Sequence, residues 1–249
     1  GQYSAAAKKF RQIEGLVSGS LKPLYHALSD VAEGYALWET FHYREAWEKF
    51  KTSLKALELS SVWGGPTGLS TVLGSIKTNA SFLESIVLDP NEVKRAIALD
   101  LLAHAKRRVE RDHNIEVAIQ ILLRSLECFA QHHLLKQYKI KTWDVQIDQL
   151  PQPLQEPCQV GMLDDIDGKY KLTLRAQFRT LAELSDPMGQ LFVTEWPKMK
   201  TLFDSANQSI LGHGFHATKL ERFHQFYTFV LKLTKVEESS LPRFPVMTL

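Results

Sequence analysis

Apolar residues recur every three to four positions along most of this chain, the spacing that places them on one face of an α-helix. The pattern is clearest in two neighbouring segments. In the first, apolar residues follow at four-residue intervals: Val93, Ile97, Leu101 and Ala105. In the second they are Ala118, Leu122, Leu126 and Phe129. We expect two helices, from about residue 90 and residue 114, joined by a short connection and therefore packed as antiparallel neighbours.

Weaker versions of the same pattern predict further helices on both sides. Before this pair we expect a helix through residues 6–17, a second opened by Pro23, an aromatic-rich segment over 35–57 and a helix over 69–87. After it we expect helices over 171–184, through 196–207 and over 219–236, with an extended or mobile tail after Glu237. The chain has neither the alternation of strands and helices nor the Gly-rich loop of a phosphate-binding α/β fold. The pattern therefore predicts an all-α fold.

The helical pattern fails between residues 139 and 170. Val145, Ile147 and Leu150 alternate, which favours a short strand or extended segment. Three prolines follow, Pro151, Pro153 and Pro157, and we expect them to exclude helix. A small hairpin is possible near residues 167–168. We interpret the segment as an irregular crossover within a helical domain of residues 89–249, preceded by an N-terminal helical region of residues 1–88.

Composition places few limits on function. The net charge of +2 offers no general attraction to nucleic acid, so an RNA-binding role needs a local basic surface. The two cysteines are too few for a disulfide framework, and we expect an intracellular, cytoplasmic protein. The sequence contains no run of about 18 apolar residues, so we expect no membrane span. No Cys/His spacing typical of zinc sites is present, and we expect neither a metal nor a cofactor.

Candidate chemistry is concentrated in residues 207–215, which read Asn-Gln-Ser-Ile-Leu-Gly-His-Gly-Phe. His213 lies between two glycines, where backbone can approach a ligand closely. An imidazole titrates near pH ~6.5 and suits proton transfer at neutral pH. His213 is thus a candidate acid/base group, and a capping or hydrogen-bonded surface histidine is the alternative.

This run resembles the motif of the HEPN ribonucleases attached to type III CRISPR systems, Arg-Asn-x-Ser-Ile-Leu-x-His-Gly, a form of Arg-x(4–6)-His. The matching residues are Asn207, Ser209, Ile210, Leu211, His213 and Gly214, whereas the arginine position holds Ala206. Weaker likeness extends over nearly the whole chain: residues 35–46, 101–108, 124–131 and 186–189 resemble other parts of the same family. The resemblance implies an all-α helical bundle of the HEPN type with additional N-terminal helices.

The resemblance also implies a mechanism and partners. HEPN enzymes cleave single-stranded RNA without a metal: the 2′-hydroxyl attacks the adjacent phosphorus at a composite site between two subunits of a homodimer. His213 and Asn207 would be catalytic, Ser209, Gly212 and Gly214 would contact the substrate, and the guanidinium absent at Ala206 would stabilise phosphoryl charge. Relatives commonly carry a CARF domain that binds cyclic oligoadenylate, and no segment here has the required strand–helix alternation.

Three interpretations remain open. The chain is a HEPN nuclease module without its arginine, either by design or as a natural inactive homologue. Alternatively, it is a non-catalytic helical dimer that binds RNA or a protein, or an α-helical scaffold whose N-terminal helices form a binding surface.

Several other residue groups have a structural interpretation that we prefer to the functional one. Arg108 to His113 also satisfies Arg-x4-His, but it lacks the companion residues and we interpret it as a solvated helix end. Glu127 and Gln131 either bond each other or lie at the edge of an apolar stripe. The remaining groups are expected to be surface or core residues: His132-His133, a poor chelate because adjacent helical residues diverge; His216 and His224; the aromatic residues of 223–229; and the basic clusters at 8–11, 106–111, 136–141 and 198–200.

Overall fold

The computed structural model describes the chain except for residues 1, 63–64, 67, 89–94, 213 and 246–249, and the side chain of residue 205. The described residues form ten α-helices and two short 3-10 helices, and none of them belongs to a named strand. The prediction of an all-α fold is confirmed. The contacts divide the chain into two units, Gly1–Asn91 with Pro242–Leu249, and Glu92–Leu241, and each unit is described here by itself.

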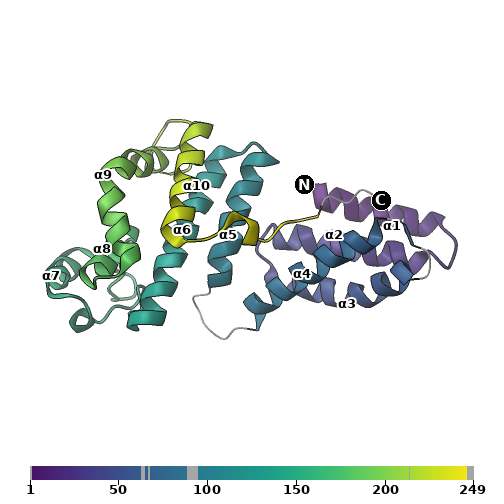
Figure 1. Cartoon of the computed structure of the whole chain (residues 1–249), viewed down its shortest axis with the longest axis horizontal. Coiled ribbons are helices and arrows are strands. Elements are labelled where there is room, and N and C mark those ends of the chain that lie inside the picture. The colour runs from purple at the N-terminus through teal and green to yellow at the C-terminus, as the bar shows by residue number, and fades with distance from the viewer. Residues whose placement is uncertain (1, 63–64, 67, 89–94, 213, 246–249) are drawn as a thin grey trace. The chain divides into compact units, whose positions relative to one another are not determined.

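The first unit is a set of four helices that pack in chain order (Figure 1). They are α1 (Gln2–Leu16), α2 (Lys22–Trp38), α3 (Tyr43–Val62) and α4 (Leu69–Val87). Pro23 lies in the first turn of α2, where its missing N–H has no helical partner to lose. The core combines large aromatic side chains with aliphatic ones from all of the last three helices: Leu28, Val31, Tyr35, Trp38, Phe50, Leu57, Ile76 and Leu83.

The aromatic-rich segment over 35–57 is divided between two helices. Tyr35 and Trp38 end α2, and Phe41 then adopts a left-handed backbone conformation with φ 64° before α3 begins. The apolar spacing continues across this break because both helices face the same core. Periodicity alone therefore could not locate the turn.

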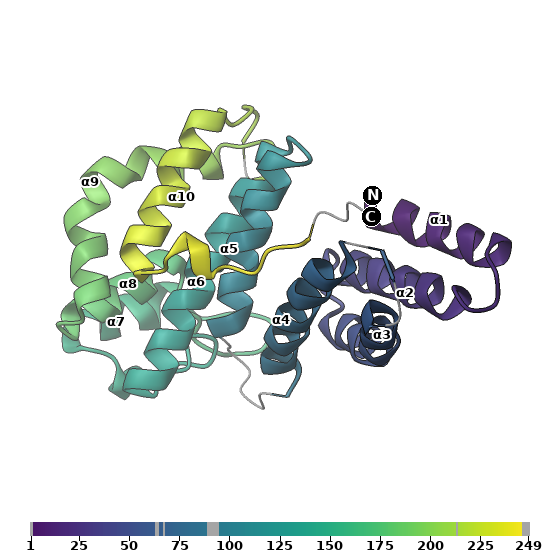
Figure 2. The same ribbon diagram turned by 45° about the vertical axis from the view of Figure 1, so that its right-hand side comes forward.

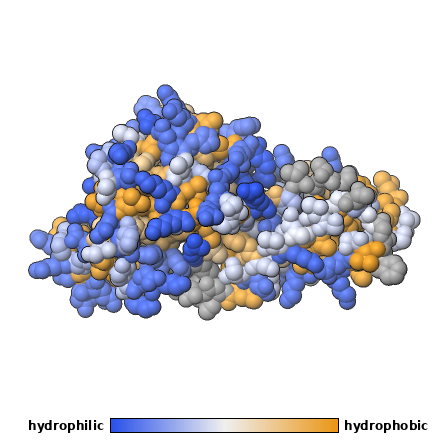
Figure 3. Space-filling view, in the orientation of Figure 1, coloured by the Kyte–Doolittle hydropathy of each residue, from blue (hydrophilic) through white to orange (hydrophobic). Residues whose placement is uncertain are grey.

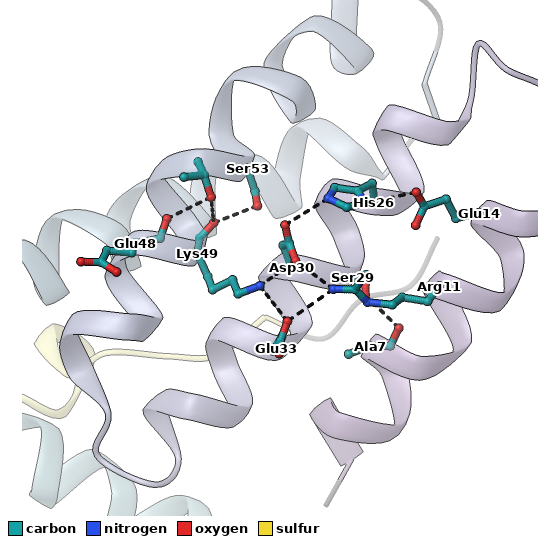
Figure 4. A network of polar contacts seen from close by, with 11 residues as sticks. Ala7, Arg11, Glu14, His26, Ser29, Asp30, Glu33, Glu48, Lys49 and Ser53 are labelled. Atoms are coloured by element: carbon teal, nitrogen blue, oxygen red, sulfur yellow. Dashed lines mark hydrogen bonds and ion pairs between the residues drawn. The ribbon is translucent and has the colours of Figure 1, made fainter.

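A polar network joins the outer faces of α1, α2 and α3 (Figure 4). The Asp30 and Glu33 carboxylates of α2 lie between Lys49 of α3 and Arg11 of α1, and Lys49 Nζ is 3.0 Å from Asp30 and 2.8 Å from Glu33. The Lys49–Glu33 contact is the main reason that the pKa of Lys49 is raised. Arg11, from one of the basic clusters, is thus engaged within its own unit.

The tail after Glu237 begins in the second unit, and its residues 242–245 pack in the first. It continues as a short 3-10 helix, η2 (Glu238–Ser240), and residues 242–245 then run without regular structure. Asn79 of α4 donates its amide to the Arg243 carbonyl at 2.9 Å. The Phe244 ring lies 4.7 Å from Tyr35 and 4.8 Å from Trp38 between centroids. An aromatic side chain from the end of the chain therefore completes the core of the N-terminal helices.

The second unit is built on a long antiparallel pair, α5 (Arg95–Glu110) and α6 (Ile115–Tyr138), as predicted (Figure 2). The Asn114 side chain caps α6 by accepting a hydrogen bond from Val117 N. α8 (Leu174–Glu183) packs on α9 (Pro187–Asn207), and α10 (Leu220–Thr234) packs on α6 and α9. The predicted core role of the α10 aromatic residues is confirmed, because Phe223, Phe226, Tyr227 and Phe229 are all buried.

The structure differs from two expectations for residues 139–170. Of the alternating residues, Ile147 begins the 3-10 helix η1 (Ile147–Gln149), Val145 and Leu150 lie outside it, and no named strand forms over residues 145–150. The proline-rich stretch forms α7 (Gln152–Gly161). Pro151 and Pro153 lie at the N-cap and the first turn, where helices tolerate proline, and only Pro157 occupies an interior position. A turn with Gly168 at φ 68° and an isolated antiparallel bridge between Leu163 and Tyr170 agree with the expected small hairpin.

The face seen in Figure 3 mixes hydrophilic and apolar areas on both units. Among the described residues, no helix combines the length and the apolar character needed to cross a bilayer.

Candidate functional site

The motif residues form a tight loop that folds back on the end of α9. Gly212 N and Gly214 N both donate to the Ser209 carbonyl, at 2.9 and 3.2 Å. His216 N donates to the Gln208 carbonyl at 3.2 Å, and Ser209 and His216 form an isolated parallel bridge. We call residues 208–218 the motif loop. His213 lies outside the described residues, so the loop is defined by its neighbours.

Glycine is required at two positions of the motif loop by the backbone of the chain itself. A Cβ atom at Gly212 would lie 2.6 Å from the Asn207 carbonyl oxygen, and one at Gly214 would lie 2.1 Å from the Gln208 carbonyl oxygen. Both distances are shorter than the 3.0 Å below which real Cβ atoms essentially never approach another heavy atom. The structure therefore shows that these two glycines allow the backbone of the loop to lie close to the backbone of residues 207 and 208.

Gln120 of α6 fixes the start of the motif loop. Its Nε2 donates to the Ala206 carbonyl and to Ser209 Oγ, both at 3.1 Å. Ser209 Oγ also accepts a hydrogen bond from Gly212 N at 3.2 Å, and the residue is fully buried. In this chain the Ser209 hydroxyl therefore organises the loop from inside.

Glu116, one turn earlier on α6, fixes the end of the motif loop. Its carboxylate accepts hydrogen bonds from Thr218 N and Thr218 Oγ1. Sequence reasoning missed both Glu116 and Gln120. The available signal was two polar residues at i and i+4, directly after a capping asparagine, in the otherwise apolar stretch of residues 115–123.

The side chains at the end of α9 and in the motif loop divide into a buried and an exposed set. Ala206 is fully buried and belongs to the core of the unit, whereas Asn207 is exposed. Three large apolar side chains point outward from the loop: Ile210 is 63% exposed, Leu211 54% and Phe215 91%. Such a concentration of exposed apolar groups on one loop is typical of an interaction surface.

The second Arg-x4-His segment is engaged in contacts of its own helix. Arg108 Nε donates to His104 Nε2 at 2.8 Å, and Arg108 also bonds Asp112 at 2.6 Å. Glu110, Asp112 and His113 are exposed, which agrees with the predicted solvated helix end, whereas His104, one turn before Arg108, is 1% exposed. Burial, reinforced by the positive charges of Arg107 and neighbouring arginines, lowers the pKa of His104 to about 3. This imidazole is therefore neutral at physiological pH.

The remaining candidates are placed as follows. Gln131 and Glu127 bond each other at 3.4 Å, with Arg124 bonded to the Glu127 carboxylate at 2.5 Å. His216 lies in the motif loop and His224 on α10, and both are exposed. Over the described part of the chain, no cluster of three His, Cys, Asp or Glu side chains is arranged to hold a metal ion.

Comparison with known protein families accounts for both units. Residues 91–237, more than half of the chain, match the family described as the Csm6 HEPN domain. The chain belongs to the Csm6 HEPN family. Residues 1–83 match the family described as the Csm6 6H domain, which corresponds to the helices α1 to α4. No curated protein matches the sequence significantly. Membership confirms the resemblance to ancillary HEPN ribonucleases of type III CRISPR systems, and RNA is the substrate class that the family implies.

Proposed function

We propose that the Csm6 HEPN unit is the catalytic module of a metal-independent endoribonuclease acting on single-stranded RNA, in a form inactivated by alanine at position 206. The observation that carries the proposal is the motif loop, because it lies at the end of α9, is fixed by Gln120 and Glu116, and exposes its apolar side chains. These features support a loop that is built rigidly and pairs with a second copy.

In the proposed reaction, the 2′-hydroxyl of one nucleotide attacks the adjacent phosphorus. The bond from phosphorus to the 5′-oxygen of the next nucleotide breaks, which leaves a 2′,3′-cyclic phosphate and a 5′-hydroxyl. A proton must leave the attacking oxygen and one must reach the leaving oxygen, and His213 is the imidazole able to serve these transfers. Asn207 is exposed beside the loop and available to orient the phosphate.

Charge on the non-bridging phosphoryl oxygens is the part of the reaction that this chain does not stabilise. An arginine at position 206 would place a guanidinium at the start of the motif, and a preorganised donor of this kind typically contributes ~3–4 kcal/mol to transition-state stabilisation. Ala206 contributes none. It also fills a core position without any exposed surface, so the helix and the loop fold normally without the charge.

A homodimer would bring two motif loops together around one phosphodiester. The three exposed side chains Ile210, Leu211 and Phe215 support an isologous contact in which the same patch occurs on both partners. Leu211→Asp and Phe215→Asp should convert the dimer into a monomer in sedimentation experiments. Leu59→Asp, at a comparably exposed site of α3, is the matched control and should leave the dimer intact.

Restoring the charge tests the enzymatic proposal. Ala206→Arg should cleave single-stranded RNA in the presence of EDTA and yield 2′,3′-cyclic phosphate ends. Because Ala206 is buried, Ala206→Met serves as the control for side-chain bulk without charge and should remain inactive. If Ala206→Arg folds and dimerises but gains no cleavage, the inactivation proposal is rejected.

The second candidate is a non-catalytic helical dimer that binds RNA or a protein. The complete burial of Ala206 favours it, since the position is packed as part of the core. Cleavage by Ala206→Arg decides between the two.

A further inference from the structure

A small pocket opens in the HEPN unit away from the motif loop. Its walls come from four helices: Arg95 of α5, Met188 of α9, Thr234 of α10, and Phe129, His132, His133, Lys136 and Gln137 of α6. Its volume is about 210 Å³, below the ~300–1,000 Å³ typical of sites that enclose drug-sized ligands. The pocket therefore suits a compact group rather than a large molecule.

Helix geometry explains why these residues meet. Positions 129, 132, 133, 136 and 137 follow the spacing i, i+3, i+4, i+7 and i+8, which defines one face of α6. α5 runs antiparallel to α6 and packs along it, so Arg95 at the start of α5 lies beside the end of α6. The adjacent histidines, a poor chelate for a metal, are thus both members of one pocket wall.

The lining carries positive charge. Arg95 and Lys136 are cations at neutral pH and both are exposed. His133 is fixed by Asp186, the N-cap of α9: the distance from His133 Nε2 to Asp186 Oδ2 is 2.7 Å, and Tyr138 OH donates to the same oxygen at 2.9 Å. Burial by itself would raise the pKa of Asp186, but the bonds from His133, Tyr138 and Met188 N hold it below its ordinary value. This carboxylate is therefore committed to its own hydrogen bonds.

We propose that this pocket binds the phosphate group of a nucleotide or of an RNA strand. Guanidinium and ammonium donors match the oxygens of a phosphate. Phe129 and Met188 add an apolar wall on which part of a sugar or base can rest. The positive charge of the pocket, its hydrogen-bond donors and its volume all match a phosphate group.

The pocket is separate from the proposed nuclease site. His133 lies 13 residues after Gln120 on α6 (133 − 120), which at ~1.5 Å per residue places them about 20 Å apart along the helix. One bound nucleotide cannot bridge that distance, whereas an RNA strand of several nucleotides can contact both places. The pocket proposal thus does not depend on cleavage at the motif loop.

Calorimetric titration of the full chain with two probes tests the proposal: uridine monophosphate, and an oligouridine of about five nucleotides without terminal phosphates. Lys136→Gln and Arg95→Gln should each weaken phosphate binding by about tenfold, the scale of one lost charge-assisted hydrogen bond. Lys141→Gln removes the same charge from an exposed lysine near the end of α6 that does not line the pocket, and it should bind like the original protein. Lys136→Arg should retain binding.

Each outcome has a defined meaning. A loss of affinity for the monophosphate alone identifies a free nucleotide as the ligand, and a loss for the oligonucleotide alone identifies the RNA backbone. If neither probe binds, or if Lys136→Gln and Arg95→Gln bind both probes as tightly as Lys141→Gln, the phosphate pocket is refuted. These readouts are equilibrium affinities, so they stand or fall independently of cleavage by Ala206→Arg.

Discussion

Gln120 offers the sharpest test of how the motif loop is held. Replacing Gln120 with leucine preserves most of the side-chain volume but removes the hydrogen bonds to the Ala206 carbonyl and Ser209 Oγ. Each bond has a net value of ~0.5–1.5 kcal/mol, and the buried acceptors lose a partner. The variant should therefore lose roughly 2 kcal/mol of loop stability, which corresponds to about a thirtyfold change in the opening equilibrium.

Native-state hydrogen exchange measures this change directly. The amides of Gly212 and Gly214 are protected by the Ser209 carbonyl, so they should exchange about thirtyfold faster in Gln120→Leu. Gln225→Leu is the matched control, because this exposed α10 glutamine makes only long contacts of 3.4 Å. Unchanged exchange at both glycines in Gln120→Leu would refute the role assigned to Gln120.

Three further predictions concern stability. Gly214→Ala should lower the thermal stability of the HEPN unit, because the new methyl group would overlap the backbone. Gly74→Ala in α4 has open space around the new methyl group and should raise the free energy of unfolding by up to ~1 kcal/mol. Equal shifts in the two variants would contradict the steric argument. The pKa of His104 is about 3 in the folded protein and 6.5 in the ordinary, unfolded state. As the pH falls from 6.5 towards 3, the unfolded chain binds a proton at His104 and the folded protein does not. The free energy of unfolding should therefore decrease over this range, by up to ~1.4 kcal/mol per pH unit. His104→Gln should flatten that dependence in urea titrations, and a slope equal to that of the original protein would show that other groups cause it. Phe244→Ala should destabilise the N-terminal unit by ~2–3 kcal/mol through lost contact with Tyr35, and unchanged calorimetric unfolding would show that the tail is not part of that core.

Long, strongly periodic helices could be read from the sequence, and their boundaries often could not. The α5–α6 pair and α4 follow directly from apolar spacing, and Asn114 marks the start of α6 through its capping side chain. The break after Trp38 is hidden, because the helices on both sides of it present aromatic side chains to one core. The prolines of residues 151–157 hide α7 in the sequence, because Pro151 and Pro153 lie near the helix start, where proline is tolerated.

The candidate site was predictable as a segment of sequence but not as an arrangement in space. The motif identified the loop, yet the residues that hold it, Glu116 and Gln120, are 86 to 102 positions earlier in the chain than the residues they bond. Their role depends on how α6 packs beside the end of α9, which local patterns do not encode. The glycine spacing predicts close contact with a ligand, whereas the structure shows that the backbone of the loop itself requires both glycines.

We propose that residues 206–214 form a ribonuclease site that lacks only its arginine, and RNA cleavage by Ala206→Arg, with and without His213→Ala, tests this proposal. We expect Ala206→Arg to cleave RNA and the double variant to be at least about 100-fold slower, the usual contribution of a general acid or base. Equal cleavage by the single and the double variant would place the activity elsewhere and refute the proposed site.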